Sequence, residues 1–344
     1  MNRIQKKLLN VFERIKQDDL NYFEEQFLYG HREILLNYIM VNGHKISEQS
    51  YLQGGLAHGW APNYEVWKLR KRNLMPAHRY IWKDSVFVPN SSKYNQIPIG
   101  APWLYLLLSL KITSGIRAEL PVVGKRENLV IPYHSLGTNL KKINQQAAHF
   151  KKFIDPKKST VCLFWLDFCD QQNRKAYKDL GFEVECVGYS HRVHNSYLIG
   201  NPRTFFLINL LTLMLEHRNV ITDSISTPVF YAGSLGKNIV IAENQIAKEY
   251  SESFDSIIQK IAKEDVGSST EWLRRNNLFQ NPSNENLFLL NFKCWEELGL
   301  NYLKNPLELS DLDWKVNMGI PNHVFKFRNK LLETKKKISF NRLN

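Results

Sequence analysis

A cluster of four small polar residues interrupts the largely apolar stretch VITDSISTPVFYAGSLGKNIVI, residues 220–241. They are Asp223, Ser224, Ser226 and Thr227, and they follow the apolar run NVIT. Because proline favours the first turn of a helix, Pro228 predicts a helix that begins near this cluster. The free N–H groups of a helix N-terminus, together with neighbouring hydroxyls, suit a phosphate group. The alternative is that the same residues only cap the helix.

An acidic residue follows the next predicted strand. This strand is NIVI, residues 238–241, and Glu243 lies just beyond it. In nucleotide-binding α/β folds, a carboxylate beyond a strand accepts hydrogen bonds from the ribose hydroxyls. The order of strand, polar loop, helix, strand and acid therefore favours a nucleotide over a plain helix cap.

Titratable and small polar residues also follow the other predicted strands. In an open parallel sheet, ligands bind beyond the carboxyl ends of the strands, so we expect these residues to share one edge. They are His58, His134, Ser135, Thr138, Asp167, Asp170, Tyr189 and Arg192. An ordinary pKa of about 6.5 suits histidine to general-base chemistry, and His58 lies in the glycine-rich loop GGLAHGW. The alternative for His58 is that it is a hydrogen-bonded loop residue without a catalytic role. The alternative for Asp167 and Asp170 is that they cap the next helix.

The alternation of strands and helices predicts an α/β protein. A chain of 344 residues exceeds what one hydrophobic core usually spans, which predicts two domains. A break rich in glycine and charge, residues 114–128, separates them. About five β/α units follow the break, which predicts a parallel, doubly wound sheet with helices on both faces. Its strands are expected at residues 128–133, 160–166, 182–188, 219–222 and 238–241.

The composition favours an anionic partner. The formal net charge is +13, which suits nucleic acid, an anionic membrane surface, or a phosphorylated or acidic substrate. No common nucleic-acid-binding motif is present, so we expect no nucleic acid partner. The four cysteines show no CxxC spacing, which argues against a zinc site and a disulfide framework.

The sequence predicts a cytoplasmic protein. The N-terminus lacks the continuous apolar region of a secretory signal, and the longest apolar run, residues 97–110, is too short to cross a bilayer. Residues 1–18 have the spacing of an amphipathic helix with basic flanks. Two interpretations of this helix stay open, namely docking on the domain and peripheral contact with an anionic inner membrane.

Three stretches resemble GT-B glycosyltransferases that build bacterial capsules and lipopolysaccharides. The stretch TDSISTPVFYAGSLGKNIVI, residues 222–241, is similar to the donor-nucleotide region of these enzymes. The motif HGWAP, residues 58–62, resembles the HG loop of the related polyol-phosphate transferases of teichoic acid synthesis. The motif IPYHSLGT, residues 131–138, is similar to the loop that opens the second domain in several of them. The resemblance covers residues 50–245.

The resemblance implies two Rossmann-like domains that face a central cleft. Residues 1–120 would form the acceptor-binding domain, residues 121–310 the nucleotide-donor domain, and residues 311–344 a helical, basic tail. It also implies catalysis without a metal and no cofactor besides the nucleotide-sugar substrate. The residues that would hold the donor and its leaving phosphate are Ser135, Thr138, Arg192, Asp223, Ser224, Ser226, Thr227 and Glu243. His58 and His134 would be the catalytic residues.

The sequence departs from the common donor families. UDP- and GDP-sugar enzymes of the retaining type usually carry an E-x7-E pair, which residues 223–231 lack. The DSIST cluster and His134 are similar to the serine, threonine and histidine residues of bacterial sialyltransferases, but the acidic-acidic-Gly and His-Pro motifs of that family are missing. A CMP-linked acidic sugar, such as Kdo or a nonulosonic acid, is therefore one candidate donor. A CDP-polyol phosphotransferase and a non-catalytic nucleotide- or polysaccharide-binding protein remain alternatives.

Overall fold

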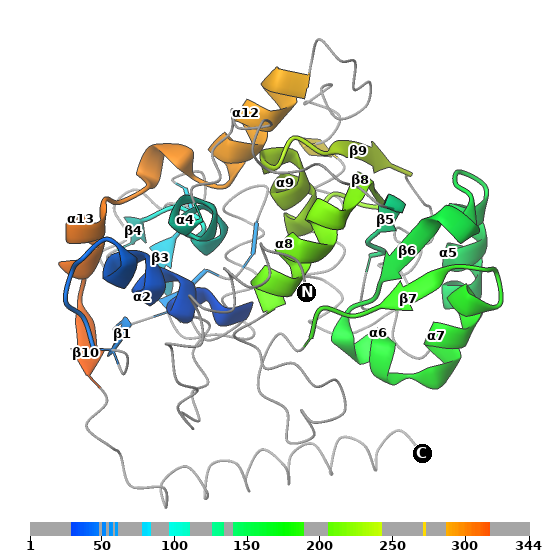
Figure 1. The fold of residues 1–344 in the computed structure, drawn as a ribbon, viewed down its shortest axis with the longest axis horizontal. Coiled ribbons are helices and arrows are strands. Elements are labelled where there is room, and N and C mark those ends of the chain that lie inside the picture. The colour runs from blue at the N-terminus through cyan, green and yellow to red at the C-terminus, as the bar shows by residue number, and fades with distance from the viewer. Residues whose placement is uncertain are drawn as a thin grey trace, which may run out of the picture.

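The computed structural model describes a molecule built from two α/β units side by side (Figure 1). The first unit lies at the left of Figure 1 and the second at the right. The described residues are 29–47, 50–52, 55–57, 59–60, 78–83, 96–110, 126–133, 140–188, 206–242, 271–272 and 287–316.

The second unit contains a five-stranded sheet in which every strand pair is parallel. Its strands are β5 (Arg126–Val130), β6 (Ser159–Cys162), β7 (Glu183–Glu185), β8 (His217–Thr222) and β9 (Asn238–Ile241). Their spatial order is β7-β6-β5-β8-β9. Counted from β5, this is the order 3-2-1-4-5 of a doubly wound Rossmann sheet. The predicted parallel, doubly wound sheet is confirmed.

Helices cover both faces of this sheet, so its central strands are buried on both sides. In β5, Leu129 packs into the core with the helices α8 (Phe206–Glu216) and α9 (Thr227–Ser234). Its neighbour Val130 packs into the opposite core with α5 (Leu140–Lys151) and α7 (Gln171–Lys178). Successive strand residues point to opposite faces, which explains this division. A short helix, α6 (Trp165–Cys169), precedes α7.

Three predicted strands end earlier than expected, since the strands predicted at residues 128–133, 160–166 and 182–188 end at Val130, Cys162 and Glu185. The apolar run at residues 160–166 was predicted to be a single strand, but β6 ends at Cys162 and α6 begins at Trp165. A continuous apolar run fits a buried strand and a buried helix equally well, so hydrophobicity alone does not mark the boundary.

The first unit also contains a parallel sheet among its described residues. Its three strands, in the spatial order β2-β3-β4, are β2 (Gly55–Leu56), β3 (His78–Ile81) and β4 (Ile97–Pro98). Two helices pack against each other beside it, α2 (His31–Val41) and α4 (Pro102–Ser109). Pro102 sits in the first turn of α4, where its missing N–H group costs nothing. The predicted α/β class with parallel sheets is therefore confirmed in both units.

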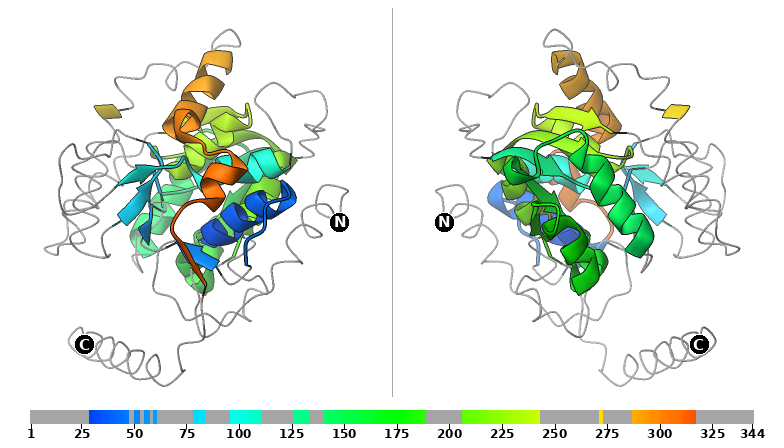
Figure 2. Two further views of the ribbon diagram at one scale, coloured as in Figure 1. Left: turned by 90° about the vertical axis from the view of Figure 1, so that its left-hand side faces the viewer. Right: turned by 90° about the vertical axis from the view of Figure 1, so that its right-hand side faces the viewer.

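The C-terminal part of the described chain returns to the first unit. Helix α12 (Leu287–Glu297) packs on α9 of the second unit. Beyond it come η8 (Leu300–Tyr302), α13 (Pro306–Ser310), which packs on α2, and β10 (Trp314–Val316) (Figure 2). Strand β10 pairs antiparallel with β1 (Ser50–Leu52). Residues 314–316 thus form a strand where a helical tail was predicted, because β1 offers them a pairing partner.

One hydrophobic core runs through both units. At their interface, the Trp103 ring of α4 stacks on Tyr231 of α9, with ring centroids 4.2 Å apart and planes 14° apart. The Trp103 indole N–H also donates to the Ser234 hydroxyl at 2.9 Å. All three residues are buried. Among the described residues, no helix has the length and apolar character needed to cross a membrane.

Candidate functional site

The carboxyl ends of β5 and β8 form the point where the strand order of the second unit reverses. Such a switch point is the usual ligand site of an open α/β sheet. The Tyr133 N–H, just beyond β5, donates to the Asp223 carboxylate, just beyond β8, at 2.6 Å. This bond holds together the two loops in which the sequence predicted a phosphate site.

The Asp223 carboxylate belongs to a buried network below this edge. Its second oxygen accepts from the Gln146 side-chain amide of α5 at 2.6 Å, and Gln146 in turn accepts from the Tyr177 hydroxyl of α7 at 2.8 Å. Burial raises the pKa of Asp223, and the bonds from Gln146 and Tyr133 oppose that rise. Both carboxylate oxygens are therefore occupied by protein donors, and Asp223 braces the two loops.

The hydroxyl groups beside Asp223 have a different environment. Ser226 is the N-cap of α9, and its side chain makes no capping bond. The Ser224 Oγ atom is buried and has no hydrogen-bond partner among the described residues. Helix starts leave N–H groups without intrahelical partners, and they carry a partial positive charge. The start of α9 thus combines hydroxyls that are free to donate with a favourable potential for an anion.

Trp60 of the first unit reaches this helix start. Its backbone N–H donates to the Thr227 Oγ1 atom at 2.9 Å, and its ring lies 4.5 Å from that of Phe230. The Trp60 indole N–H donates to Glu297 of α12 at 2.8 Å, and the same carboxylate pairs with Lys83. Trp60 of the HGWAP motif and Thr227 of the DSIST cluster, 167 residues apart in the chain, therefore meet in space.

Six predicted site residues lie outside the described part of the chain. They are His58, His134, Ser135, Thr138, Arg192 and Glu243. Tyr133, which directly precedes His134, lies at the site and contacts Asp223. Ala242, which directly precedes Glu243, donates its N–H to the Thr222 carbonyl at 2.7 Å. The roles predicted for the six residues stay predictions.

The two aspartates that follow β6 belong to the helices α6 and α7. Asp170 is the N-cap of α7, and its side chain accepts from the Gln172 N–H at 2.8 Å. The capping interpretation of Asp170 is therefore confirmed. Asp167 lies in the first turn of α6 and lines a space of about 10 Å³ beside Tyr177 and Gln146. The described residues contain no group of three His, Cys, Asp or Glu side chains that could hold a metal ion.

Sequence reasoning missed four residues that shape this site, namely Gln146, Tyr177, Trp60 and Glu297. Gln146 had a visible signal, because it occupies the apolar face of α5 between Ile143 and Phe150. A polar residue on a buried helical face must find a hydrogen-bonding partner. The other three show no such pattern, because their partners come from distant parts of the chain.

No protein-family model matches the chain, and no curated protein matches it. Several solved structures show a distant likeness, and three of them illustrate it. The co-structure of S. aureus MnaA with UDP is 10% identical and covers 89% of this chain and 82% of its own, with a TM-score of 0.36. UDP-GlcNAc 2-epimerase from Neisseria meningitidis bound to UDP-GlcNAc is 14% identical and covers 96% and 89%, with a TM-score of 0.32.

The third structure is the spinosyn rhamnosyltransferase SpnG complexed with spinosyn aglycone. It is 10% identical and covers 71% of this chain and 59% of its own, with a TM-score of 0.24. At these TM-scores the likeness is remote, and the chemistry of the site follows from its own residues.

Proposed function

We propose that this chain is a GT-B glycosyltransferase that moves a sugar from a nucleotide donor to a surface-polysaccharide or lipid-linked acceptor. The observation that carries the proposal is the hydroxyl cluster at the start of α9, where Ser224, Ser226 and Thr227 lie beside the switch point of a Rossmann-ordered sheet. In this proposal the cluster binds the phosphate of the donor, and the first unit contributes the acceptor side through the loop of Trp60.

The contacts of Thr227 support this role. Its Oγ1 atom accepts a hydrogen bond from the Trp60 N–H, so its own proton is free to donate to an anion. The Ser226 hydroxyl is likewise not used in capping. As the bond between the sugar and the phosphate breaks, negative charge grows on the leaving phosphate, and fixed donors stabilise that charge.

The remaining roles follow the sequence analysis. The acceptor hydroxyl attacks the anomeric carbon, its proton passes to His58, and the nucleotide leaves with both electrons of the broken bond. His134, Arg192, Ser135 and Thr138 assist at the phosphate. Glu243 would accept from the ribose hydroxyls, and transfer would need no metal. A CMP-linked Kdo or nonulosonic acid is the donor favoured by the DSIST cluster, and the acceptor would lie at an anionic inner membrane.

A ligand screen on the full-length protein tests the phosphate site. CMP, CDP, UDP and GDP are added in turn, and the shift in thermal midpoint is measured, because a ligand that binds only the folded state raises the apparent stability. We expect one of them to raise the midpoint of the wild type. The Ser224→Ala/Ser226→Ala variant should lose at least tenfold in affinity for that nucleotide.

Thr227 provides the matched control. Thr227→Ser keeps the hydroxyl and should retain nucleotide binding, whereas Thr227→Val has a similar shape without the hydroxyl and should lose it. Equal affinity of all these variants would refute the phosphate site. Transfer assays with the nucleotide that binds then identify the reaction. A glycosidic product supports the proposal, a phosphodiester product would instead indicate polyol-phosphate transfer, and binding without turnover would indicate a binding protein.

A further inference from the structure

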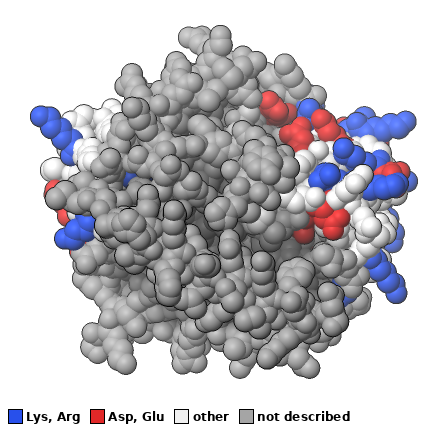
Figure 3. All heavy atoms as spheres, turned by 90° about the horizontal axis from the view of Figure 1, so that it is seen from below, with Lys and Arg blue, Asp and Glu red and all other residues white. Residues whose placement is uncertain are grey.

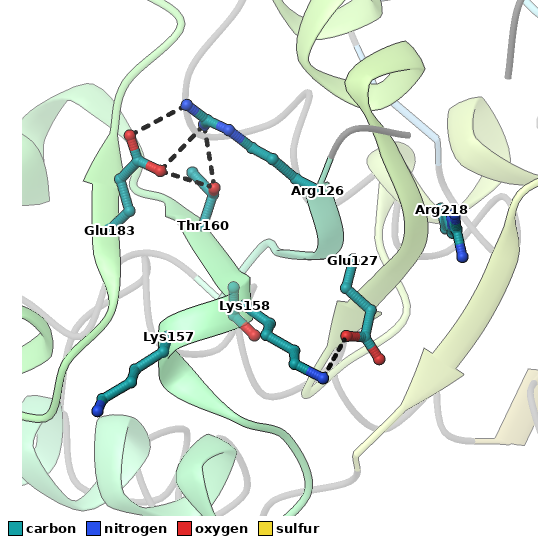
Figure 4. Close-up of a pocket in the computed structure, with 8 residues that line it drawn as sticks. Arg126, Glu127, Lys157, Lys158, Thr160, Glu183 and Arg218 are labelled. Atoms are coloured by element: carbon teal, nitrogen blue, oxygen red, sulfur yellow. Dashed lines mark hydrogen bonds and ion pairs between the residues drawn. The ribbon is translucent and has the colours of Figure 1, made fainter. Parts of the chain in front are cut away.

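A pocket lies at the opposite edge of the five-stranded sheet from the start of α9. Its volume is about 390 Å³, and its walls come from the first residues of β5, β6 and β7, from the start of β8, and from the 3-10 turn η3 (Pro156–Lys158) (Figure 4). The strands are parallel, so their amino ends share this edge and their carboxyl ends share the edge with Ser226. The pocket is therefore separate from the proposed donor site.

Three ion pairs lie at the pocket. Arg126 lies 2.8 Å from a carboxylate oxygen of Glu185 and 3.2 Å from one of Glu183. Lys158 lies 3.5 Å from a carboxylate oxygen of Glu127. These pairs neutralise two of the four cations that line the pocket.

The other two cations are Lys157 and Arg218. Both are exposed, and no carboxylate of the described residues pairs with either side chain. They stand on different sides of the pocket, Lys157 on η3 and Arg218 on β8 (Figure 4). The lining has four cations and two carboxylates, and Glu185, which pairs with Arg126, adds a third carboxylate beside it, so the local excess is one positive charge. Seen from below, this unit carries many basic side chains among acidic ones (Figure 3).

Arg218 is not needed to cap the helix that precedes it. Cations near a helix C-terminus commonly bond the last carbonyls, and α8 ends at Glu216. The Lys237 ammonium already donates to the carbonyl of Leu215 at 3.5 Å and to that of His217 at 2.7 Å. The His217 ring nitrogen Nδ1 lies 2.7 Å from the Leu213 carbonyl. The guanidinium of Arg218 thus remains available to a ligand.

The floor of the pocket is held by buried hydrogen bonds. Thr160 is buried, and its Oγ1 atom lies 3.2 Å from an Arg126 guanidinium nitrogen and 3.0 Å from His217 Nε2. Ser159 is also buried, and its hydroxyl donates to the Asp155 carbonyl at 2.6 Å. Because these groups are already satisfied, a ligand would meet a preformed surface and would need to recruit only the two unpaired cations.

We propose that this pocket binds a small ligand that carries a diphosphate or a comparable doubly charged phosphate group. A guanidinium presents paired donors that match phosphate oxygens, and an ammonium adds a point charge on the opposite side. The volume lies within the range of small-molecule sites. Two separate cations favour two negative charges over one. This site does not depend on the proposed transfer activity.

Calorimetric titration of the full-length protein with inorganic pyrophosphate tests the site at low ionic strength. We expect saturable binding, and the Lys157→Ala/Arg218→Ala variant should bind at least tenfold more weakly. Both side chains are exposed, so the variant should unfold at the wild-type midpoint. The matched control is Lys175→Ala/Lys178→Ala, which removes two exposed lysines of α7 and should leave the affinity unchanged.

Two further arms separate the alternatives. The Ser224→Ala/Ser226→Ala variant should keep the pocket's affinity for pyrophosphate, which distinguishes this site from the donor site at α9. Binding to vesicles with and without phosphatidate shows whether the pocket accepts the phosphate of a lipid headgroup or only that of a soluble molecule. Either result supports the proposal if the Lys157→Ala/Arg218→Ala variant loses the binding. Unchanged binding of that variant in every arm would overturn it.

Discussion

The ammonium group of Lys237 is buried and bonds the carbonyls of Leu215 and His217. Burial lowers its pKa from 10.5 to about 8, because desolvation disfavours the charged form. Between these two values, the unfolded chain holds a proton on Lys237 that the folded chain has released. The contribution of Lys237 to the free energy of unfolding therefore rises with pH across this window.

Replacing this lysine should remove that dependence on pH. We expect the difference in unfolding free energy between the wild type and Lys237→Met to change in favour of the wild type as the pH increases from about 8 towards 10.5. Urea unfolding at a series of pH values measures it. Lys178→Met, at an exposed position of α7, is the control and should follow the wild type. A difference that stays flat over this range would contradict the assigned burial of the charge.

The sequence predicted which types of residue form the candidate site, but it did not predict where their side chains point. The pattern at residues 222–227 marked the polar loop correctly, since a loop between a strand and a helix must hold such residues. It could not show that Asp223 turns inward to Tyr133 and Gln146, whereas Ser224 has a buried hydroxyl without a partner. Side-chain direction depends on which neighbours the fold supplies, and those neighbours are about 77 to 90 positions away in the chain.

At the scale of elements, α9 and α12 approach so closely that only glycine fits at one position. A Cβ atom on Gly233 would lie 2.1 Å from the Sγ atom of Cys294 and 3.1 Å from its Cβ atom. The Asn291 side chain donates to the Gly233 carbonyl at 2.8 Å and fixes the same contact. The start of α9 carries the hydroxyl cluster, so this packing also fixes the position of the candidate site.

Filling this contact should destabilise the protein. We expect Gly233→Ala to lower the unfolding free energy by about 1–3 kcal/mol, which is the usual cost of overpacking a core. Adding Cys294→Ala removes the Sγ atom and should recover part of the loss, and a double-mutant cycle measures the coupling. Strictly additive effects of the two substitutions would show that α9 and α12 do not meet at this place.

The repeating elements of the second unit could be predicted because alternating strands and helices leave a regular hydrophobic pattern. The pattern failed where apolar residues continue through a boundary, as between Cys162 and Trp165. It also gave no sign that residues 314–316 pair with β1, because strand pairing across more than 260 positions depends on the finished fold. The domain limits at residues 120 and 310 stay a prediction.

At the scale of the whole molecule, the two α/β units share one core. The buried cluster contains Leu35 and Leu106 of the first unit, Leu211 and Phe230 of the second, and Leu298 beyond α12. Each unit alone would expose the apolar surface that the other covers. Trp60 adds hydrogen bonds to α9 and α12 at the same interface.

The shared core should make unfolding cooperative. We expect scanning calorimetry of the full-length protein to show one transition, with a calorimetric enthalpy close to the van 't Hoff enthalpy. Trp103→Ala, which removes the stacking on Tyr231, should lower the midpoint of that single transition. Two resolved peaks in the wild type would instead mean that each unit is stable alone.

The pairing of β1 with β10 joins an early and a late part of the chain, so it cannot form in the order in which the residues are synthesised. Strand β1 leaves the ribosome more than 260 residues before residues 314–316 are made. Domains usually fold as units from the N-terminus during synthesis. Here the edge of β1 that binds β10 stays without its partner strand until more than 260 further residues have been made, so the first unit cannot complete this pairing as it emerges.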